Sequence, residues 1–234
     1  MVPVARSTLV DTIAAAIVDR IVSGKLEPGD PLPSQDALAA DLGVSRLTVR
    51  EAVKALAQSG IVRVEHGSGT FVNPGHRWTD LGALSRLAAD AEGAIDVPMA
   101  LIEVRRMIEV GAAELCARRH TPDVIVALDA ALAGMAAATD ASDLPAYVRH
   151  DIAFHDAILR GSGNPFIAAV FVPMRAELER ARTQTSSVDA IRRHALAHHR
   201  AIRDAIAARD AAGARAAMDA HMDQTADDLA VHLA

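Results

Sequence analysis

The strongest constraint on the fold is a pair of short helices near the start of the chain, each bounded by its own capping signals. Ser34 is placed to cap a helix over residues 35–42, and Gly43 is placed to end it, because glycine readily adopts the left-handed conformation that closes a helix. Ser45 is placed to cap a second helix over residues 46–58. Two helices separated only by this short turn predict a helix-turn-helix.

The hydrophobic period changes from helical to strand-like directly after the second of these helices. Residues 61–64 and 70–72 have the composition and length of strands, and a His-Gly-Ser-Gly run lies between them. This pattern predicts a hairpin with a glycine-rich tip. With an earlier helix at about 7–23, it predicts a winged helix-turn-helix over residues 6–74.

The composition is compatible with two globular domains, but it argues against binding of nucleic acid through overall positive charge. The chain has 234 residues, of which 51% are hydrophobic, so globular domains are expected. Its formal net charge is -6, and residues 1–75 hold 7 Lys and Arg against 8 Asp and Glu. A protein that coats nucleic acid through charge alone needs a strongly basic domain. Any contact with DNA must therefore be local.

The helix over residues 46–58 has an apolar face and a positively charged face. The apolar face consists of Val49, Ala52, Val53 and Leu56. Arg46, Arg50 and Lys54 follow at intervals of four and form a positive stripe. Side chains near the start of a recognition helix reach base edges in the major groove, and arginine suits guanine with two hydrogen bonds. We expect Arg46 and Arg50 to contact bases or phosphates; the alternative is an ordinary solvated face.

Small polar residues and glycines beside this helix suit the DNA backbone. The hydroxyl groups of Ser45 and Thr48, at the start of the helix, suit phosphate oxygens. In the hairpin tip, Gly67 and Gly69 lack side chains, so the backbone there can approach a phosphate or the minor groove, with His66 alongside. The alternative for the tip is a plain hairpin turn.

The rest of the chain divides into a linker and a helical part. Residues 75–98 hold several glycines around a weakly helical piece and are interpreted as a linker. Alanine-rich amphipathic segments then follow one another without strand signals, at roughly 99–119, 122–138, 143–161, 165–182, 188–209 and 211–232. Residues 99–232 are predicted to form an all-helical antiparallel bundle of about six helices. The predicted fold class is therefore mainly α.

Cysteine usage and hydropathy indicate a soluble cytoplasmic protein. The single cysteine, Cys116, excludes an intramolecular disulfide and fits a reducing compartment, most simply as a residue of a helix core. Charged residues interrupt the apolar stretch at 13–22, which favours an amphipathic helix over a signal peptide. No segment reaches the roughly 18 uninterrupted apolar residues that a membrane span needs.

Acidic and histidine side chains lie on inward faces of the helical part. One inward stripe consists of Val148, Asp151, Ile152, His155 and Leu159. Burying Asp151 and His155 costs several kcal/mol unless something pairs with them, and this spacing makes half of a site for a divalent cation. His221 also continues an inward stripe, in the last helix. In the helix before it, periodicity leaves both His198 and His199 open as a further ligand.

Arg105 lies on an inward stripe of its helix as well. An inward guanidinium requires an anion, and Glu109, one turn further on, is one alternative. We expect a pocket in which Arg105 and a divalent metal ion hold a small organic carboxylate, with Asn164 as a hydrogen-bonding wall. Nitrogen and oxygen ligands without a thiolate suit Zn, Ni or Mn.

A dense set of motifs runs through residues 6–74. These are Gly24, Leu26, Pro28-Gly29-Asp30, Leu32-Pro33-Ser34, Leu38-Ala39, Leu42-Gly43-Val44-Ser45-Arg46, Thr48-Val49-Arg50-Glu51-Ala52, Leu56, Gly60 and Gly67-Ser68-Gly69-Thr70-Phe71-Val72. They closely resemble the GntR-type winged helix-turn-helix. The resemblance implies DNA contacts at the recognition helix, the start of the helix before it and the wing tip: Arg46, Thr48, Arg50, Ser34, His66 and Gly67. Relatives often carry a basic residue near position 36, where this chain has Asp36.

Looser motifs cover residues 99–230. These are Glu103-Val104-Arg105-Arg106, Glu109, Asp151-Ile152-Ala153-Phe154-His155, Gly163-Asn164-Pro165, His199-Arg200-Ala201-Ile202, Ala205-Ile206, Asp210, Ala217-Met218 and His221. They resemble the FCD ligand-binding domain that accompanies this winged helix in the FadR subfamily. The resemblance implies a metal site made of Asp151, His155, His199 and His221, so it chooses His199 over His198.

Together the two parts predict a sequence-specific DNA-binding transcription regulator, expected to be a repressor. A homodimer would place one recognition helix in each half of a palindromic operator in double-stranded DNA. Binding of the acid at the metal would then change the affinity for the operator.

Two alternatives come from other classes of protein. One is a metal-dependent enzyme built on the helical part, in which an open metal position activates water. Four protein ligands with no general base beside them argue against it, so no catalytic residue is expected. The other is a binding module in which the histidines line a pocket without a metal.

Overall fold

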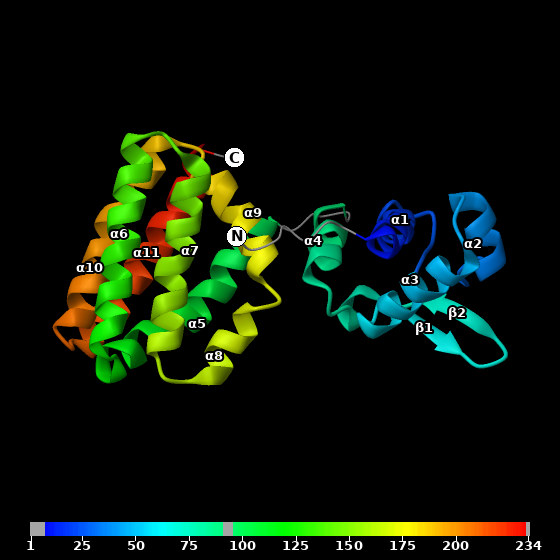
Figure 1. Ribbon diagram of the computed structural model, residues 1–234, viewed down its shortest axis with the longest axis horizontal. Coiled ribbons are helices and arrows are strands. Elements are labelled where there is room, and N and C mark those ends of the chain that lie inside the picture. The colour runs from blue at the N-terminus through cyan, green and yellow to red at the C-terminus, as the bar shows by residue number, and fades with distance from the viewer. Residues whose placement is uncertain (1–7, 91–95, 233–234) are drawn as a thin grey trace. The chain divides into compact units, whose positions relative to one another are not determined.

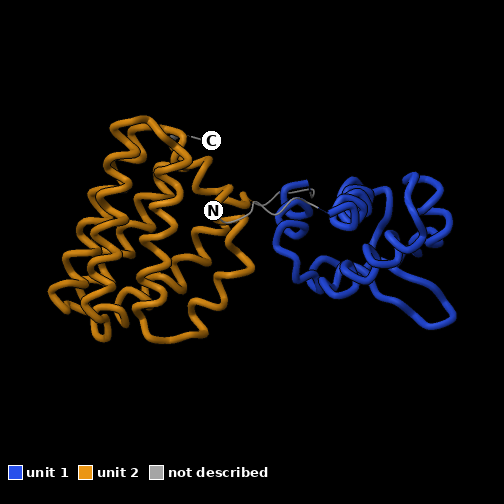
Figure 2. The backbone as a smooth tube through the Cα atoms, viewed as in Figure 1, with its two compact units in different colours: residues 1–95 blue, residues 96–234 orange. Residues whose placement is uncertain are grey.

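A computed structural model describes residues 8–90 and 96–232, and the chain divides into two compact units between residues 95 and 96 (Figure 2). Unit 1 holds three helices and a small antiparallel hairpin, followed by a short additional helix. Unit 2 is entirely helical over its described residues. The predicted fold class, a winged helix-turn-helix followed by a helical bundle, is confirmed.

Unit 1 begins with the predicted three helices and wing (Figure 1). The helices and strands are α1 (Leu9–Val22), α2 (Gln35–Leu42), α3 (Arg46–Gln58), β1 (Val62–Glu65) and β2 (Gly69–Val72). The two strands pair in an antiparallel register that runs from Val62 opposite Val72 to Glu65 opposite Gly69. This register leaves residues 66–68 as the tip of the wing.

Local capping fixes the ends of α2 and α3. The Ser34 hydroxyl accepts a hydrogen bond from the Ala37 amide at 3.1 Å, and the Ser45 hydroxyl accepts one from the Thr48 amide at 3.1 Å. Gly43 ends α2 with a φ of 65°, which glycine adopts without strain. The predicted starts of both helices and the turn between them are confirmed.

A single apolar cluster holds unit 1 together. Its buried members are Ile13, Ile17, Val18, Ile21, Leu32, Leu38, Val49, Ala52, Val53, Leu56, Ile61, Val62, Val72, Trp78 and Ala83. The four residues predicted for the apolar face of α3 are all among them. Because that face is buried, the opposite face of α3 is presented to solvent.

The segment interpreted as a linker, residues 75–98, contributes structure to unit 1. A 3-10 turn (η1, Gly75–Arg77) and α4 (Leu81–Asp90) lie within it. The side chain of Trp78 is buried in the apolar cluster and donates a hydrogen bond to the Asn73 carbonyl at 3.0 Å. Residues up to 90 thus pack as part of unit 1. Residues 91–95 of the expected linker lie outside the described residues, and its last residues, 96–98, cap and begin the first helix of unit 2.

Unit 2 is a bundle of antiparallel helices (Figure 1). Its helices are α5 (Val97–Arg119), α6 (Pro122–Asp140), α7 (Leu144–Gly161), α8 (Pro165–Phe171), α9 (Arg175–Thr185), α10 (Asp189–Ala207) and α11 (Ala211–His232). Helix α5 packs against α7 and α11, and α10 packs against α6 and α11. Residues from α5, α7, α10 and α11 thereby meet in the interior.

One predicted helix is two helices in the structure. The sequence pattern predicts a continuous helix over 165–182, but α8 ends at Phe171 and α9 begins at Arg175. Pro173 lies between them and explains the break, because proline lacks a backbone N–H and its ring collides with the preceding turn of a helix. The described part of unit 2 therefore has seven helices where about six were expected.

Helix α6 is the most apolar long helix of the described residues. Its mean hydropathy over 18 residues is 1.4, so by length and composition it is long and apolar enough to cross a membrane. Its sequence is rich in alanine, and it packs along α7 and α10 as a member of the bundle. A core helix of a bundle meets the same criterion, so this is weak evidence for a span.

Candidate functional site

The positive stripe of α3 lies at the surface of unit 1. The side chains of Arg46 and Arg50 are 68% and 61% exposed, and Lys54 is exposed one turn further on. Both guanidinium groups are therefore free to reach a duplex. The contacts with bases that we expect of them remain a prediction.

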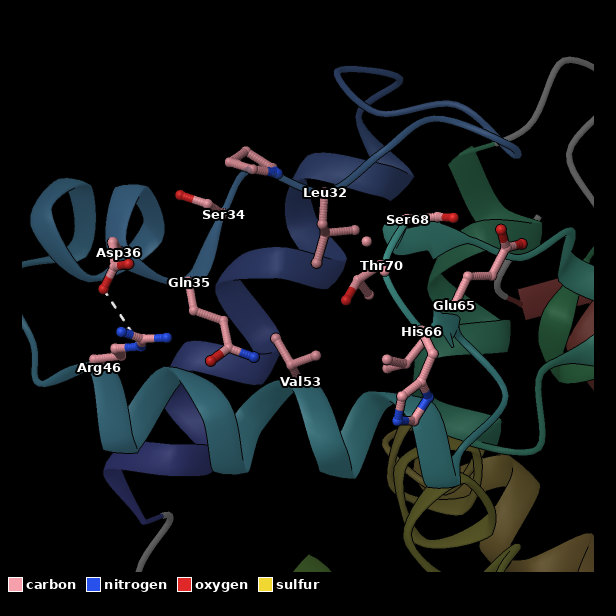
Figure 3. Close-up of a pocket in the computed structure, with 14 residues that line it drawn as sticks. Leu32, Ser34, Gln35, Asp36, Arg46, Val53, Glu65, His66, Ser68 and Thr70 are labelled. Carbon is pink, nitrogen blue, oxygen red and sulfur yellow. Dashed lines mark ion pairs between the residues drawn. The ribbon is translucent and has the colours of Figure 1, made fainter.

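A groove of about 620 Å³ runs between the start of α2, α3 and the wing (Figure 3). Ser34 and Asp36 line it from α2, Arg46 from α3, and His66 and Gly67 from the wing tip. Residues predicted separately as DNA contacts thus border one depression. A groove of this kind, with donors on both sides, suits a sugar-phosphate backbone.

An acidic residue lies beside the recognition arginine. Oδ1 of Asp36 is 3.4 Å from Nε of Arg46, and both side chains are exposed (Figure 3). Such an exposed ion pair contributes less than about 1 kcal/mol, so DNA can displace it. The structure places Asp36 in the lining of the groove, near the position where the family resemblance led us to expect a basic residue.

Two of the predicted phosphate contacts already have internal partners. Besides capping α3, the Ser45 hydroxyl lies 2.8 Å from the Thr48 hydroxyl. The start of α3 therefore has its two hydroxyls ordered at the surface. At the wing tip Gly67 has a φ of 78° and open space where a side chain would be, so a backbone approach to DNA is sterically free.

In unit 2, three histidines from three helices meet in the interior. They are His155 of α7, His199 of α10 and His221 of α11, with exposed fractions of 2%, 0% and 3%. One ring nitrogen of each lies within 4.8 Å of the others. The Nε2 atoms of His155 and His199 are 3.2 Å apart.

The structure distinguishes His198 from His199, the two candidate ligands between which helical periodicity could not choose. His199 belongs to the buried cluster, whereas His198 is half-buried and its ring centre is 6.1 Å from that of His221. The register implied by the family resemblance thus brings together the residues it named. His198 stands at the edge of the cluster.

Asp151 lies beside the histidines on α7. Its Oδ1 atom is 3.3 Å from Nε2 of His199 and 3.8 Å from Nε2 of His155. Its other oxygen, Oδ2, is 2.6 Å from Nε of Arg182. The carboxylate therefore faces the imidazoles with one oxygen and a guanidinium with the other.

Arg105 and Glu109, one turn apart on α5, complete the cluster. Arg105 Nε donates a hydrogen bond to Glu109 Oε1 at 2.8 Å, which is the pair considered from the sequence. Nη2 of Arg105 also lies 3.4 Å from Nε2 of His155. Glu109 Oε2 is 2.5 Å from Nδ1 of His155, so Glu109 contacts both an arginine and a histidine of the site.

The sequence analysis did not assign Arg182 to the site. Its side chain is 7% exposed and extends from α9 to Asp151. The signal that could have identified it is the spacing of Leu178, Arg182 and Thr185, which puts an arginine on the buried face of a short helix. The predicted continuous helix over 165–182 ended at this residue and hid that spacing.

Asn164, expected as a wall of the pocket, caps α8 instead. Its side-chain oxygen accepts a hydrogen bond from the Phe166 amide at 3.0 Å. The cavities beside the histidines are lined by residues of α5, α7, α8, α9 and α11, among which Asn164 does not appear within the described residues. A contact between Asn164 and a ligand remains a prediction.

Burial and charge set the protonation of the cluster. Burial disfavours the charged imidazole, so the pKa of His155 lies below 6.5 and the pKa values of His199 and His221 lie well below it. Burial raises the pKa of Asp151, but the charges around it, that of Arg182 first, together outweigh burial, and the pKa is lowered. Neutral imidazoles and an ionised carboxylate are the states in which these side chains bind metals.

The donor set fits a divalent metal ion. Three neutral imidazoles converge and a carboxylate oxygen lies beside two of them. The Nδ1 atom of His199 is buried and makes no hydrogen bond within the described residues. Nitrogen and oxygen ligands without thiolate suit Zn²⁺, Ni²⁺ or Mn²⁺.

Comparison with known proteins assigns each unit to a family. Residues 9–72 match the model of the bacterial regulatory proteins of the gntR family, and residues 100–224 match the FCD domain. The HTH-type transcriptional regulator Mce2R of Mycobacterium tuberculosis is 32% identical over 219 residues, covering 92% of this chain and 89% of its own. The galactonate operon transcriptional repressor of Escherichia coli is 29% identical over 204 residues, which cover 86% of this chain and 87% of the repressor.

A solved structure agrees at the level of the fold. Lar, which controls expression of the Listeria monocytogenes agr system, superposes with a TM-score of 0.66 at 18% identity and covers 97% of this chain and 99% of its own. The matched families consist of transcriptional regulators, so the alternative of an enzyme is not supported. The chain belongs to the GntR family of DNA-binding transcriptional regulators, with a C-terminal FCD domain, and it is a regulator rather than an enzyme.

Proposed function

We propose that this regulator is a repressor whose affinity for its operator is controlled by a small organic acid bound at a metal ion in unit 2. The observation that carries the proposal is the buried cluster of His155, His199 and His221 beside Asp151. Burial lowers the pKa values of these three imidazoles, which favours their neutral form. Neutral imidazoles this close together can bind one cation between them.

In this proposal the four side chains hold the metal and Arg105 supports the acid. A bound Zn²⁺, Ni²⁺ or Mn²⁺ would supply a Lewis-acidic position to which a carboxylate can bind. Arg105 lies within 3.4 Å of His155 and is buried, so its guanidinium adds a charge-assisted donor at that position. Asn164 stays a proposed contact at the rim.

A relative supports the chemical class of the effector. The Escherichia coli relative is named as a repressor of a galactonate operon, and galactonate is an organic acid. This name supports repression, and a connection with an organic acid, for the chain described here. Our proposal extends them to it through the buried cation site.

For the DNA-binding unit we propose contacts from Ser34, Ser45, Arg46, Thr48, Arg50, His66 and Gly67. Arg46 and Arg50 would contact base edges, and the hydroxyls and the wing would contact phosphates. A homodimer would place two copies of α3 on a palindromic operator, and the site of action would be the cytoplasm, where chromosomal DNA lies.

The test begins with the metal. Full-length protein is purified without added metal, and its metal content is measured by mass spectrometry alongside His155→Ala and His198→Ala. The proposal expects one equivalent in the wild type and in His198→Ala, and little in His155→Ala. No metal in the wild type would favour a binding module in which the histidines bind no metal, and one equivalent in all three proteins would remove His155 from the ligands.

The second step measures the response of DNA binding. The operator is obtained by selection from random duplexes, and its affinity is measured by electrophoretic mobility shift with metal-loaded protein and a panel of small carboxylates. At least one acid should weaken binding to the operator, and His155→Ala should lose that response. A wild-type protein that ignores every acid in the panel contradicts the proposal.

A further inference from the structure

Arg182 is a buried cation with unused hydrogen-bonding capacity. Its Nε atom approaches Asp151 Oδ2, but neither Nε nor Nη2 makes a hydrogen bond of good geometry to any group in residues 8–90 or 96–232. Arg105 differs, because its Nε donates to Glu109 at 2.8 Å. A buried guanidinium with free donors beside a ligand site is a binding group for an anion.

The charges around the histidines balance before any metal binds. Two buried cations, Arg105 and Arg182, face two buried carboxylates, Glu109 and Asp151. Asp156, the next nearest carboxylate to Arg182, is already paired with Arg175 at 2.5 Å. A histidine that binds a metal ion does so as a neutral imidazole, so the three histidines add no charge.

A divalent cation therefore adds two positive charges to four side chains whose own charges already cancel. Uncompensated charge in a site removed from water is strongly unfavourable. An effector with one carboxylate would neutralise half of this charge, and an effector with two would neutralise all of it. Charge balance thus favours a dianion.

The positions of the two arginines match such a ligand. Both side chains line the same small cavity, together with Thr185 and Thr225. Both guanidinium groups also approach Oε1 of Glu109, Arg105 at 2.8 Å and Arg182 at 3.8 Å. Two cationic groups therefore border one cavity, where they can bind the anionic groups of a ligand.

Helix α9 also controls the space for the ligand. Leu178 and Arg182 line this cavity and a second one beside His155, and each cavity has a volume of about 10 Å³, the room of one water molecule. A dicarboxylate can enter only if α9 shifts outward. The break at Pro173 leaves α9 a short separate helix, so it can move without unwinding its neighbours.

We propose that Arg182 is a second anion-binding residue of the effector site and that the effector is a dicarboxylate. This inference rests on the proposed function, because it takes the metal-bound acid as given and names its class. Arg182 would bind the carboxylate that the metal and Arg105 do not hold. It would also orient Asp151 by holding its Oδ2 while Oδ1 faces the metal position.

The test compares acids that differ in one feature. Calorimetric titration of zinc-loaded full-length protein is carried out with succinate, with butyrate, which has the same length and one carboxylate, and with galactonate, which has one carboxylate and several hydroxyls. We expect succinate to bind at least about 10-fold more tightly than either monocarboxylate, as one charge-assisted contact provides.

Variants of Arg182 separate binding from structure. Arg182→Gln should weaken the binding of succinate by about 10- to 100-fold and change the affinity for butyrate by less than about 2-fold. Arg182→Lys should keep part of the preference for succinate over butyrate. Arg180→Gln, an exposed arginine two residues away on α9, is the matched control and should bind like the wild type. Zinc content and thermal melting are measured for each protein.

The outcomes distinguish this inference from the function on which it rests. If butyrate or galactonate binds as tightly as succinate, or if Arg182→Gln weakens mono- and dicarboxylates equally, the inference is wrong while an acid-binding site remains. If Arg182→Gln fails to fold, the wild-type preference and Arg182→Lys decide. If no acid of either class binds, the proposed function fails as well.

Discussion

Oε2 of Glu109 lies 2.5 Å from Nδ1 of His155, while the same carboxylate accepts a hydrogen bond from Arg105 through Oε1. A proton on Nδ1 leaves Nε2 as the basic nitrogen of His155, and Nε2 is the atom that faces His199. Glu109 therefore selects the tautomer that can bind a metal. Carboxylates in this position also make the imidazole a stronger ligand.

Replacing this carboxylate should weaken the metal site without removing a ligand. Glu109→Gln is expected to lower the affinity for Zn²⁺ by about 10- to 100-fold, because a neutral amide replaces the charged carboxylate that orients the His155 ring and strengthens it as a ligand. Competition with a fluorescent zinc chelator measures the effect. Glu103→Gln, an exposed change on the same helix, is the control. Equal zinc affinities for both variants would mean that Glu109 has only a structural role.

The histidine cluster should make the metal-free protein sensitive to acid. The pKa values of His155, His199 and His221 lie below 6.5 when folded, so below about pH 6.5 the unfolded chain binds more protons than the folded one. The free energy of unfolding should then fall as the pH falls, by up to about 1.4 kcal/mol per pH unit for each histidine. Denaturant titrations of protein stripped of metal, at pH 7.5 and pH 5.5, test this. A stability that is flat or rises towards pH 5.5 contradicts it.

The arginines of α3 should dominate recognition of the operator. Arg46→Ala and Arg50→Ala are each expected to lower operator affinity by about 1–3 kcal/mol and to reduce discrimination between bases. Mobility shifts with the selected operator and with single-base variants measure both effects. Lys25→Ala removes an exposed positive charge outside α2, α3 and the wing, and should have little effect. Wild-type affinity in both arginine variants would remove α3 from the interface.

Trp78 should be essential to the stability of unit 1. Removing its buried indole is expected to cost about 3–5 kcal/mol, because a cavity opens in the apolar cluster and the Asn73 carbonyl loses its donor. Thermal melting of Trp78→Ala and of Trp78→Phe, followed by circular dichroism, measures the loss. Since Trp78 is the only tryptophan of the chain, its emission reports unfolding of the wild type. If Trp78→Ala melts like the wild type, residues 75–90 act as a linker after all.

Local signals predicted the parts of the fold that depend on neighbours in sequence. Ser34, Gly43 and Ser45 set the ends of α2 and α3 through hydrogen bonds and backbone preferences that act within four residues. Inward stripes likewise placed Asp151, His155 and His221 in the interior. Sequence patterns of this kind are sufficient to predict a helix end or a buried helix face, because both depend on residues within a few positions of one another.

Features that depend on distant contacts were not predictable in this way. Trp78 stands among glycines and prolines that suggest a linker, and only the uncovered apolar surface of the winged helix gives it a place to pack. Arg182 is one of many arginines, and its burial follows from how α9 lies against α5 and α7. The choice between His198 and His199 needed either a family register or the packing of α10.

The ion pair of Asp36 and Arg46 has a consequence for how the protein searches a chromosome. If DNA occupies the groove as we propose, it must take Arg46 away from Asp36, and the carboxylate then stays in the groove and repels nearby phosphates. This penalty would apply to every DNA sequence, and only contacts with the bases of a matching site would offset it. Random genomic DNA would then dissociate quickly, so Asp36 would raise selectivity by weakening non-specific binding.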